Sequence, residues 1–406
     1  MRIIVWGINY APEITGIGPH NAALCEFLKS SGHDVRMLTT FSYYPSWRKL
    51  PADCGRIYRT DQVNGIEVHR CWHFVPCHAS NWKRIFHEMS FILTSMLRFL
   101  TLKRPDLIIV VSPPLLIGAA AWLGGILKGV PFVFHVQDLQ PDGAVGLGML
   151  KQSVFTRLLY GLEAFVYRKA YRVSGISRGM TEAFSKKEVP VSRQIYFPNT
   201  IVVPKPEEIP ALGQFRANHG FSPTDFLAVH SGNVGIKHGL HVLVEAACLI
   251  KNKRIQLLVC GEGTARSSLE ELIKRHALKN VLLLPLQSES EYRSMLVDAD
   301  ICLIMQQKGS GRSFFPSKLL NALAYSRPVM AVTDSESELS RVIGEGNFGV
   351  VVPHDDPKTL AGELERLAAD PHSLAEFGGS GRTFVAQYDR ELVFRNFAAA
   401  ISQDAT

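Results

Sequence analysis

Cysteine is scarce in this sequence of 406 residues: there are 7, an odd number, and no two of them form a C-x-x-C pair. This excludes a disulfide framework and a zinc ribbon, and it indicates a reducing compartment. Glycine (32) and proline (22) occur in ordinary numbers, which excludes a collagen-like or low-complexity chain. Short-period repeats are also absent, so the chain is not a solenoid.

The sequence shows no targeting segment and has one candidate membrane span. The first apolar run is short and is flanked by Arg2 and Glu13, unlike a signal peptide. The candidate span, 107–127, contains Pro113-Pro114 and three glycines. We interpret it as a buried strand, a turn and a helix, and we expect a cytoplasmic protein.

The overall composition is that of a globular protein, but its charge is unevenly spread. Hydrophobic residues make up 46% and charged residues 20%, which excludes wholesale disorder. The net charge is +7, of which residues 1–200 carry +10 and residues 201–406 carry −3. Two halves of opposite sign indicate two domains, the basic one facing nucleic acid, an anionic membrane or a phosphorylated substrate.

Short β-branched runs alternate with helix-period segments through both halves of the chain. This alternation predicts an α/β protein with two doubly wound, Rossmann-like domains that face a cleft. Four prolines within 198–210 mark the linker. We expect domains at 1–200 and 201–375, followed by C-terminal helices at 376–406 that pack back toward the first domain. Strands are expected at 2–8, 34–39, 65–71, 106–111, 131–137, 171–176 and 193–197, and then at 226–231, 255–260, 281–284, 300–304, 328–332 and 349–352.

Three glycine-bearing loops, each after a predicted strand, and one helix start hold the residues suited to binding a ligand. The loops cover 9–18, 231–239 and 260–263, and the helix begins near Pro316. Glycine lets a ligand approach the backbone, and a helix start favours an anion. A lysine in such a loop, Lys237, can clamp a diphosphate. The alternative is a set of tight turns with a solvated lysine.

The chain resembles the family 4 retaining glycosyltransferases of the GT-B fold, and within them the capsule and colanic-acid type. The resemblance covers nearly the whole chain, about residues 1–390. It rests on the order and spacing of seven pieces: Gly7–Gly18, Tyr43-Tyr44-Pro45, His135-Val136-Gln137-Asp138, Phe197-Pro198-Asn199, Ser231–Gly235, Leu284–Gln287 and Pro316–Leu319.

The resemblance implies that the first domain holds the acceptor and the second binds a nucleotide-sugar. It implies transfer with retention, from a donor such as GDP-fucose to a lipid-linked or oligosaccharide acceptor in exopolysaccharide biosynthesis. The family's usual pair of glutamates falls on Ser313 and Asn321 here, and its loop arginine falls on Asn233. We expect Lys318 to supply the missing positive charge.

The expected site residues fall into three groups by role. The catalytic group is Asp138, Lys237 and Lys318. The donor-binding group is Gly16, Asn233, Lys237, Gly261, Glu262, Leu286, Ser317, Lys318 and Asn321. The acceptor-side group is Thr15, His135 and Asp138, where a helix cap, an ion pair or a buried histidine is the alternative explanation.

The chemistry expected of these residues is stabilisation of a leaving diphosphate. Negative charge grows on the leaving oxygen, and fixed cations and helix starts aimed there lower the barrier. We identify no D-x-D metal signature, so we expect no metal and no cofactor beyond the nucleotide-sugar. Paired carboxylates of the glycosidase kind are not evident, which favours transfer over hydrolysis.

Two further functions of the same fold stay open, a nucleotide-sugar epimerase and a non-catalytic nucleotide-sugar-binding protein. Nucleic acid is not expected, because no binding motif is present. The segment 81–104 combines basic and aromatic residues with apolar helical spacing, which is typical of a helix on an anionic membrane. A core helix with solvated ends is the alternative.

Overall fold

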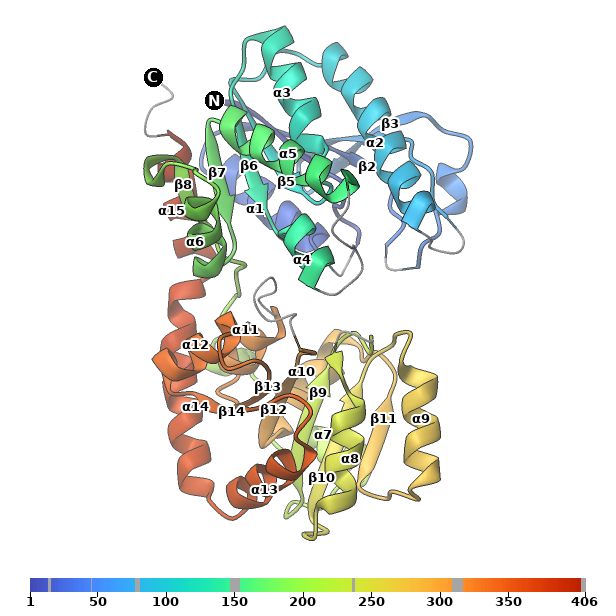
Figure 1. Ribbon diagram of the computed structural model, residues 1–406, viewed down its shortest axis with the longest axis vertical. Coiled ribbons are helices and arrows are strands. Elements are labelled where there is room, and N and C mark those ends of the chain that lie inside the picture. Colours follow the sequence, from blue (N-terminus) through green and yellow to red (C-terminus); the bar gives the residue numbers. More distant parts are fainter. Residues whose placement is uncertain are drawn as a thin grey trace. The chain divides into compact units, whose positions relative to one another are not determined.

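The computed structural model describes residues 1–13, 16–44, 46–76, 81–146, 154–235, 238–308 and 317–402. The chain divides into two compact units, shown in Figure 1. Unit 1 is Met1–Asn199 with Glu391–Thr406, and unit 2 is Thr200–Arg390. The boundary lies at the start of the proline-rich segment expected as the linker.

Unit 1 is built on an eight-stranded sheet with the order β3-β4-β2-β1-β5-β6-β7-β8. All neighbouring strands are parallel except β3, which runs antiparallel to β4. The strands are β1 Arg2–Gly7, β2 Asp34–Thr40, β3 Tyr58–Val63, β4 Ile66–Cys71, β5 Leu107–Ser112, β6 Phe132–Val136, β7 Arg172–Gly175 and β8 Gln194–Tyr196.

The edge strand β3 is the one strand of this sheet that the sequence analysis missed. Its residues alternate between exposed and half-buried, so it lacks the apolar run that marks the other strands. Asn64 and Gly65 join it to β4 with φ values of 50° and 77°. An Asn-Gly pair between two strand-like runs is a strong hairpin signal, so the sequence did contain the information.

Helices cover both faces of this sheet, which explains why its central strands are apolar on both sides. On one face Trp6 stacks on Phe99 of α2 (Asn81–Thr101) at 5.2 Å, and α2 lies beside α3 (Ile117–Lys128). Next to α3 comes α5 (Val154–Lys169). On the other face Ile3 and Val5 pack with α1 (Gly18–Ser30). The short helices are α4 Gln140–Gly146 and α6 Arg178–Lys186.

The last helix, α15 (Arg390–Ser402), completes the core of unit 1 although it is the C-terminal end of the chain. Phe397 stacks on Phe197 with ring centroids 3.9 Å apart and an interplanar angle of 13°. The preceding helix, α14 (Pro371–Val385), belongs to unit 2. The helices expected over 376–406 are therefore divided between the two units.

Unit 2 is a six-stranded, wholly parallel sheet with the order β11-β10-β9-β12-β13-β14. Its strands are β9 Phe226–Ser231, β10 Ile255–Cys260, β11 Val281–Leu284, β12 Ile301–Met305, β13 Val329–Val332 and β14 Gly349–Val352. Its helices, besides α14, are α7 Gln214–His219, α8 His241–Leu249, α9 Arg266–Arg275, α10 Glu289–Asp298, α11 Ser317–Ala324, α12 Glu338–Gly346 and α13 Pro357–Ala368. Every strand expected for this half is present.

The apolar stretch 107–127 is a buried strand followed by a helix, β5 and all of α3 except its last residue, as the sequence analysis interpreted it. Among the described residues, no helix is both long enough and apolar enough to cross a bilayer.

Candidate active site

The strand order of unit 2 reverses direction between β9 and β12. The chain moves outward from β9 through β10 to β11 and then returns to the other side of β9 with β12. Crossover helices leave on opposite faces at such a point, and ligands of doubly wound sheets bind there, beyond the carboxyl ends of the strands. The unit thus has a preformed place for a ligand next to Ser231, the last residue of β9.

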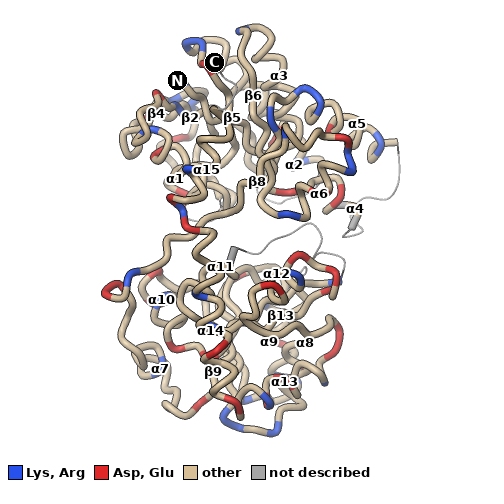
Figure 2. Tube along the Cα trace, turned by 90° about the vertical axis from the view of Figure 1, so that its left-hand side faces the viewer, with Lys and Arg blue, Asp and Glu red and all other residues tan. Residues whose placement is uncertain are grey.

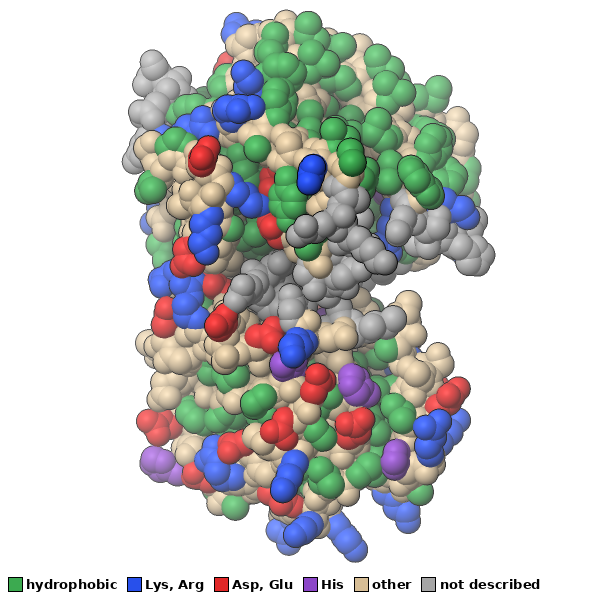
Figure 3. Space-filling model, in the orientation of Figure 1, with side chains coloured by type: hydrophobic (Ala, Val, Ile, Leu, Met, Phe, Trp, Pro, Cys, Tyr) green, Lys and Arg blue, Asp and Glu red, His purple; other side chains and the backbone are tan. Residues whose placement is uncertain are grey.

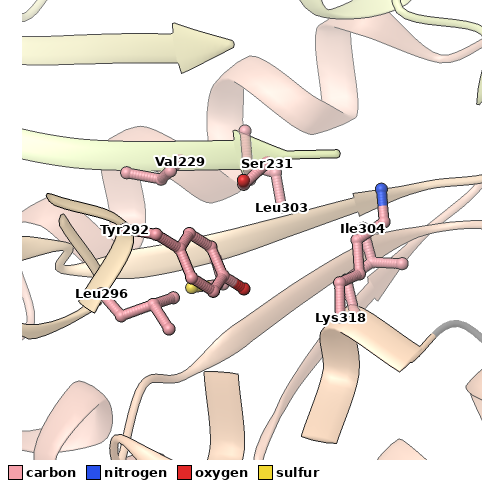
Figure 4. A pocket seen from close by; sticks show the side chains of 8 residues that line it. Val229, Ser231, Tyr292, Leu296, Leu303, Ile304 and Lys318 are labelled. Carbon is pink, nitrogen blue, oxygen red and sulfur yellow. The ribbon is translucent and has the colours of Figure 1, made fainter. Parts of the chain in front are cut away.

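A small pocket lies at this point. Figure 4 shows the Tyr292 ring of α10 and the Lys318 side chain of α11 at its edges. The strand residues that line it are Val229, Ser231, Cys302, Leu303 and Ile304, and α10 adds Leu296.

The loops after β9 and β10 touch each other through backbone, which only glycine allows. A Cβ atom on Gly261 would lie 1.8 Å from the carbonyl oxygen of Gly232, and one on Gly263 would lie 2.3 Å from that of Val234. Gly232 and Gly261 have φ values of 134° and 145°, in the region that favours glycine. The backbone N–H of Val234 donates to the Glu262 carbonyl at 2.9 Å. The two predicted donor loops therefore pack directly against each other.

Lys318 lies in the first turn of α11 and reaches the end of β9. Its Nζ is 3.3 Å from Nε2 of His230, and it would lie 3.5 Å from a Cβ atom on Gly232. His230 is fully buried, and its Nδ1 lies 3.2 Å from the Leu303 carbonyl oxygen. Because a carbonyl only accepts, Nδ1 carries the proton and Nε2 turns its lone pair to the ammonium.

Burial, followed by the positive charge of Lys318 and the neighbouring His238, holds the pKa of His230 well below its usual range. The imidazole is therefore neutral, and Lys318 is the cation of this pair. The sequence analysis quoted His230 within its motif but assigned it no role. A polar residue at the end of an otherwise apolar strand, directly before a glycine loop, is the signal that could have identified it.

Asn321 lies one helical turn after Lys318 and shares a side-chain hydrogen bond with Tyr292. Burial raises the pKa of Tyr292, so its hydroxyl stays protonated. Tyr292 is a second site residue that the sequence analysis missed, because nothing in the sequence of α10 distinguishes it from a core aromatic residue.

Three other predicted donor residues border the same loops. The Asn233 side chain faces Gly235 and Gly263, and its Oδ1 would be 2.6 Å from a Cβ atom on Gly263. Glu262 is exposed and lies 3.8 Å from Arg266, whose Nη1 donates to the Leu284 carbonyl at 2.9 Å. Leu286 follows β11 and is 56% exposed. Five predicted donor residues thus lie at or beside the carboxyl-terminal edge of the unit 2 sheet: Asn233, Gly261, Glu262, Lys318 and Asn321.

Some predicted residues fall outside the described part of the chain. These are Thr15, Lys237 and Ser313, together with Pro45 and Pro316 of the motifs. Of Ser317, the structure describes only its place as the first residue of α11.

In unit 1 the loop after β1 is held by a buried carboxylate. Glu13 accepts hydrogen bonds from the backbone N–H groups of Tyr43 and Tyr44, at 3.0 and 3.1 Å, and from Asn9 Nδ2 at 2.8 Å. Gly16 follows with a φ of 71° and borders the Tyr44 ring. The carboxylate therefore joins the loops that follow β1 and β2, although burial raises its pKa.

The two predicted acceptor-side residues near β6 have different surroundings. Asp138 is exposed just beyond the strand. His135 is buried, with Nδ1 2.9 Å from Ser174 Oγ and Nε2 2.8 Å from Gln137 Nε2. Burial lowers the pKa of His135 to about 3, so the ring is neutral at physiological pH. His135 and Gln137 share one face, as strand alternation predicts.

One D-x-D sequence outside the predicted loops, Asp298-Ala299-Asp300, was overlooked in the sequence analysis. Its carboxylates are occupied by protein groups. Asp298 accepts from the backbone N–H groups of Gly213 and Arg216, and Asp300 pairs with the Arg216 guanidinium at 2.7 Å. The pair anchors α7. Within the described ranges, no group of three or more His, Cys, Asp or Glu side chains is arranged to hold a metal ion.

Comparison with known proteins identifies the family of this chain. Residues 15–200 match the glycosyl transferase 4-like domain, and residues 213–384 match the glycosyl transferases group 1 domain. A protein of Escherichia coli K12 named as a colanic acid biosynthesis glycosyl transferase, WcaI, is 30% identical over 98% of both chains. The chain belongs to the glycosyltransferases. Another similar protein, named as the glycosyltransferase WbjE of Pseudomonas aeruginosa, is 28% identical over 74% of this chain and 75% of its own.

Similar solved structures identify the fold of this glycosyltransferase as GT-B. Sucrose-phosphate synthase of Thermosynechococcus elongatus superposes with a TM-score of 0.78 at 18% identity, covering 99% of each chain. Anabaena Alr3699/HepE in complex with UDP superposes with a TM-score of 0.71 at 14% identity, covering 99% of this chain and 100% of its own. The predicted α/β class with two Rossmann-like domains is confirmed, as is the predicted family.

Proposed function

We propose that this glycosyltransferase moves a sugar from a nucleoside diphosphate donor, with retention of configuration, to a lipid-linked or oligosaccharide acceptor in the synthesis of a surface polysaccharide. The observation that carries the proposal is the position of the Lys318 ammonium. It lies at the strand-order reversal of unit 2, beside the Gly232 backbone and at the start of α11. The role of the colanic-acid relative supports the polysaccharide assignment.

In the proposed reaction the bond between the sugar and the β-phosphate oxygen breaks, and charge accumulates on the departing diphosphate. Lys318 and the N–H groups that open α11 are positive and already in place. His230 keeps the ammonium near the Gly232 loop while staying neutral itself, so it adds no competing charge. Asp138, at the end of β6, is proposed to orient the acceptor hydroxyl.

The donor is proposed to bind unit 2, with its base near Leu286 and Gly261 and its ribose near Asn321. Two neighbouring structures hold UDP and UDP-glucose, which supports a nucleotide-sugar as the ligand class. We propose GDP-fucose from the resemblance to the colanic-acid type. Lys237 is proposed to share the diphosphate with Lys318, and the positive groups make a metal unnecessary.

We also propose that the enzyme works in the cytoplasm, at the inner face of the membrane. The net charge of +10 on residues 1–200 supports this, because anionic lipids attract basic surfaces.

The test is to incubate the protein with UDP- and GDP-sugars, with and without lipid-linked acceptors, and to measure released nucleoside diphosphate. Release that requires an acceptor, with the anomeric configuration of the product unchanged from the donor, is the expected result. Conversion of the sugar without release would instead identify an epimerase. Binding with neither reaction, across the whole panel, would leave a non-catalytic binding protein.

A further inference from the structure

The outer face of α2 carries large apolar side chains that no described residue of unit 1 covers. Trp82 is 80% exposed, Leu93 64% and Leu97 53%. These positions continue a stripe along the whole helix, and the adjacent helices α3 and α5 extend it. The apolar face of these three helices is defined by Trp82, Ile85, Phe86, Met89, Leu93, Leu97, Leu100, Leu123, Ile126, Leu127, Val154, Phe155 and Leu158.

The three helices form one continuous layer because α3 is packed tightly against both neighbours. A Cβ atom on Gly124 would lie 2.8 Å from the Phe99 ring of α2, and one on Gly118 would lie 2.4 Å from Val166 of α5. Trp122 and Phe165 meet edge to face at 4.8 Å, which joins α3 to α5. Figure 3 shows hydrophobic side chains over the part of unit 1 where Figure 1 places these helices.

Basic side chains border this apolar face. Lys83 and Arg84 are exposed at the start of α2, and Lys103 and Arg104 just after its end. Arg157 is exposed on α5. Figure 2 shows the basic and acidic positions along the trace.

Acidic groups are few on the same helices. Glu163 of α5 is buried and paired with Lys187. Glu88 of α2 is half-buried, and burial raises its pKa to about 7. Within the described residues of these helices, the charge at the edge of the apolar face is therefore mostly positive.

We infer that the apolar face of α2, α3 and α5 docks on an anionic lipid bilayer, with its aromatic and aliphatic side chains entering the headgroup region and its basic border contacting lipid phosphates. Apolar area and positive charge are the two contributions that hold peripheral helices on such membranes. A second copy of the chain fits less well, because a symmetric contact would place the same basic border against itself. The inference rests on the proposed location at the inner face of the membrane, and it adds the surface that makes the contact.

Sedimentation of the full-length protein with vesicles tests this directly and needs no donor or acceptor. Vesicles of phosphatidylcholine alone are compared with vesicles that also contain phosphatidylglycerol. We expect the wild type to bind the anionic vesicles. The charge-reversal variant Lys83→Glu, Arg84→Glu, Lys103→Glu, Arg104→Glu should bind them more weakly. Its partition coefficient should fall by about fivefold or more for each basic residue reversed. The apolar variant Leu93→Glu, Leu127→Glu should lose at least about tenfold.

Matched controls come from unit 2. Leu212 and Leu249 are exposed to 77% and 48%, so Leu212→Glu, Leu249→Glu makes the same chemical change elsewhere. Lys251, Lys253, Arg254 and Lys279 are exposed and serve as the charge-reversal control. Both controls should bind as the wild type does, and thermal unfolding should show that all variants are folded.

Three results would overturn the inference. The first is equal partition of wild type and both variants. The second is equal binding to neutral and anionic vesicles. The third is a dimer in solution that the Leu93→Glu, Leu127→Glu variant abolishes, because it would assign the face to a second copy. Donor turnover is to be measured separately, with the lipid-linked acceptor dissolved in detergent. Absent turnover with intact vesicle binding would count against the proposed transfer reaction alone, and turnover without vesicle binding would count against the membrane contact alone.

Discussion

The Lys318 ammonium is the charge on which the proposed donor site depends most. Replacing it by Gln removes a charge-assisted contact to a diphosphate, so we expect the Kd for the preferred nucleoside diphosphate to rise about tenfold to a hundredfold. Isothermal calorimetry measures this, with Lys279→Gln as the control at an exposed lysine of the same unit. Equal affinities for both variants would contradict the assignment.

His135 makes the stability of unit 1 depend on pH. Its folded-state pKa is about 3, against an ordinary value of 6.5, because burial disfavours the charged ring. Between these values the unfolded chain binds a proton that the folded chain does not, so stability falls as the pH falls through this window. One such group approaches a slope of about 1.4 kcal/mol per pH unit.

The prediction is checked by denaturant unfolding at several pH values for wild type and His135→Gln. The variant, which cannot titrate, should lose less stability than the wild type between neutral and acidic pH. Identical slopes would show that folding does not shift the pKa of this histidine.

Where β9 and β10 end, the contact between their loops predicts a strict need for glycine. In Gly261→Ala the new methyl group would meet the Gly232 carbonyl at 1.8 Å, so the loops must separate. We expect a loss of about 1–3 kcal/mol in unfolding free energy together with weaker diphosphate binding. Chemical denaturation and calorimetry measure the two effects.

Gly362→Ala provides the matched control for this substitution. Gly362 is exposed within α13, and a Cβ atom added there would have no neighbouring atom within 4 Å. Alanine should stabilise that helix by up to about 1 kcal/mol. If Gly261→Ala behaved in the same way, the close approach of the two loops would be incorrect.

The packing of α15 on unit 1 predicts that unit 1 is less stable when the contacts of this helix are removed. Phe397 is buried and stacked on Phe197, so Phe397→Ala should cost about 3–5 kcal/mol of unfolding free energy. Arg395, on the exposed side of the same helix, should change it by no more than about 0.5 kcal/mol when replaced by Ala. Similar costs for the two variants would mean that α15 does not pack in this way.

Across the whole molecule, most elements were predictable because both sheets are buried on two sides. Buried parallel strands are continuous apolar runs, and these stand out in the sequence. The half-exposed edge strand β3 has no such run and was missed, although Asn64-Gly65 marks its hairpin.

The candidate site was predictable as a set of loops but not as a set of contacts. Glycines and Lys318 stand next to strand ends in the sequence, so the sheet edge could be inferred. Lys318 pairs with His230, and Asn321 pairs with Tyr292. In each pair the two residues belong to different elements of the fold. Their pairing depends on which strands are neighbours and on the direction of each side chain, which residue spacing does not specify.

The measurement that tests the central claim most directly is acceptor-dependent release of nucleoside diphosphate by the wild type and by the variant Lys237→Gln, Lys318→Gln. If positive groups at this end of unit 2 stabilise the departing diphosphate, kcat/KM should fall by at least about a hundredfold to a thousandfold. The control variant Lys251→Gln, Lys279→Gln should retain full activity. Unchanged turnover by Lys237→Gln, Lys318→Gln would contradict the account.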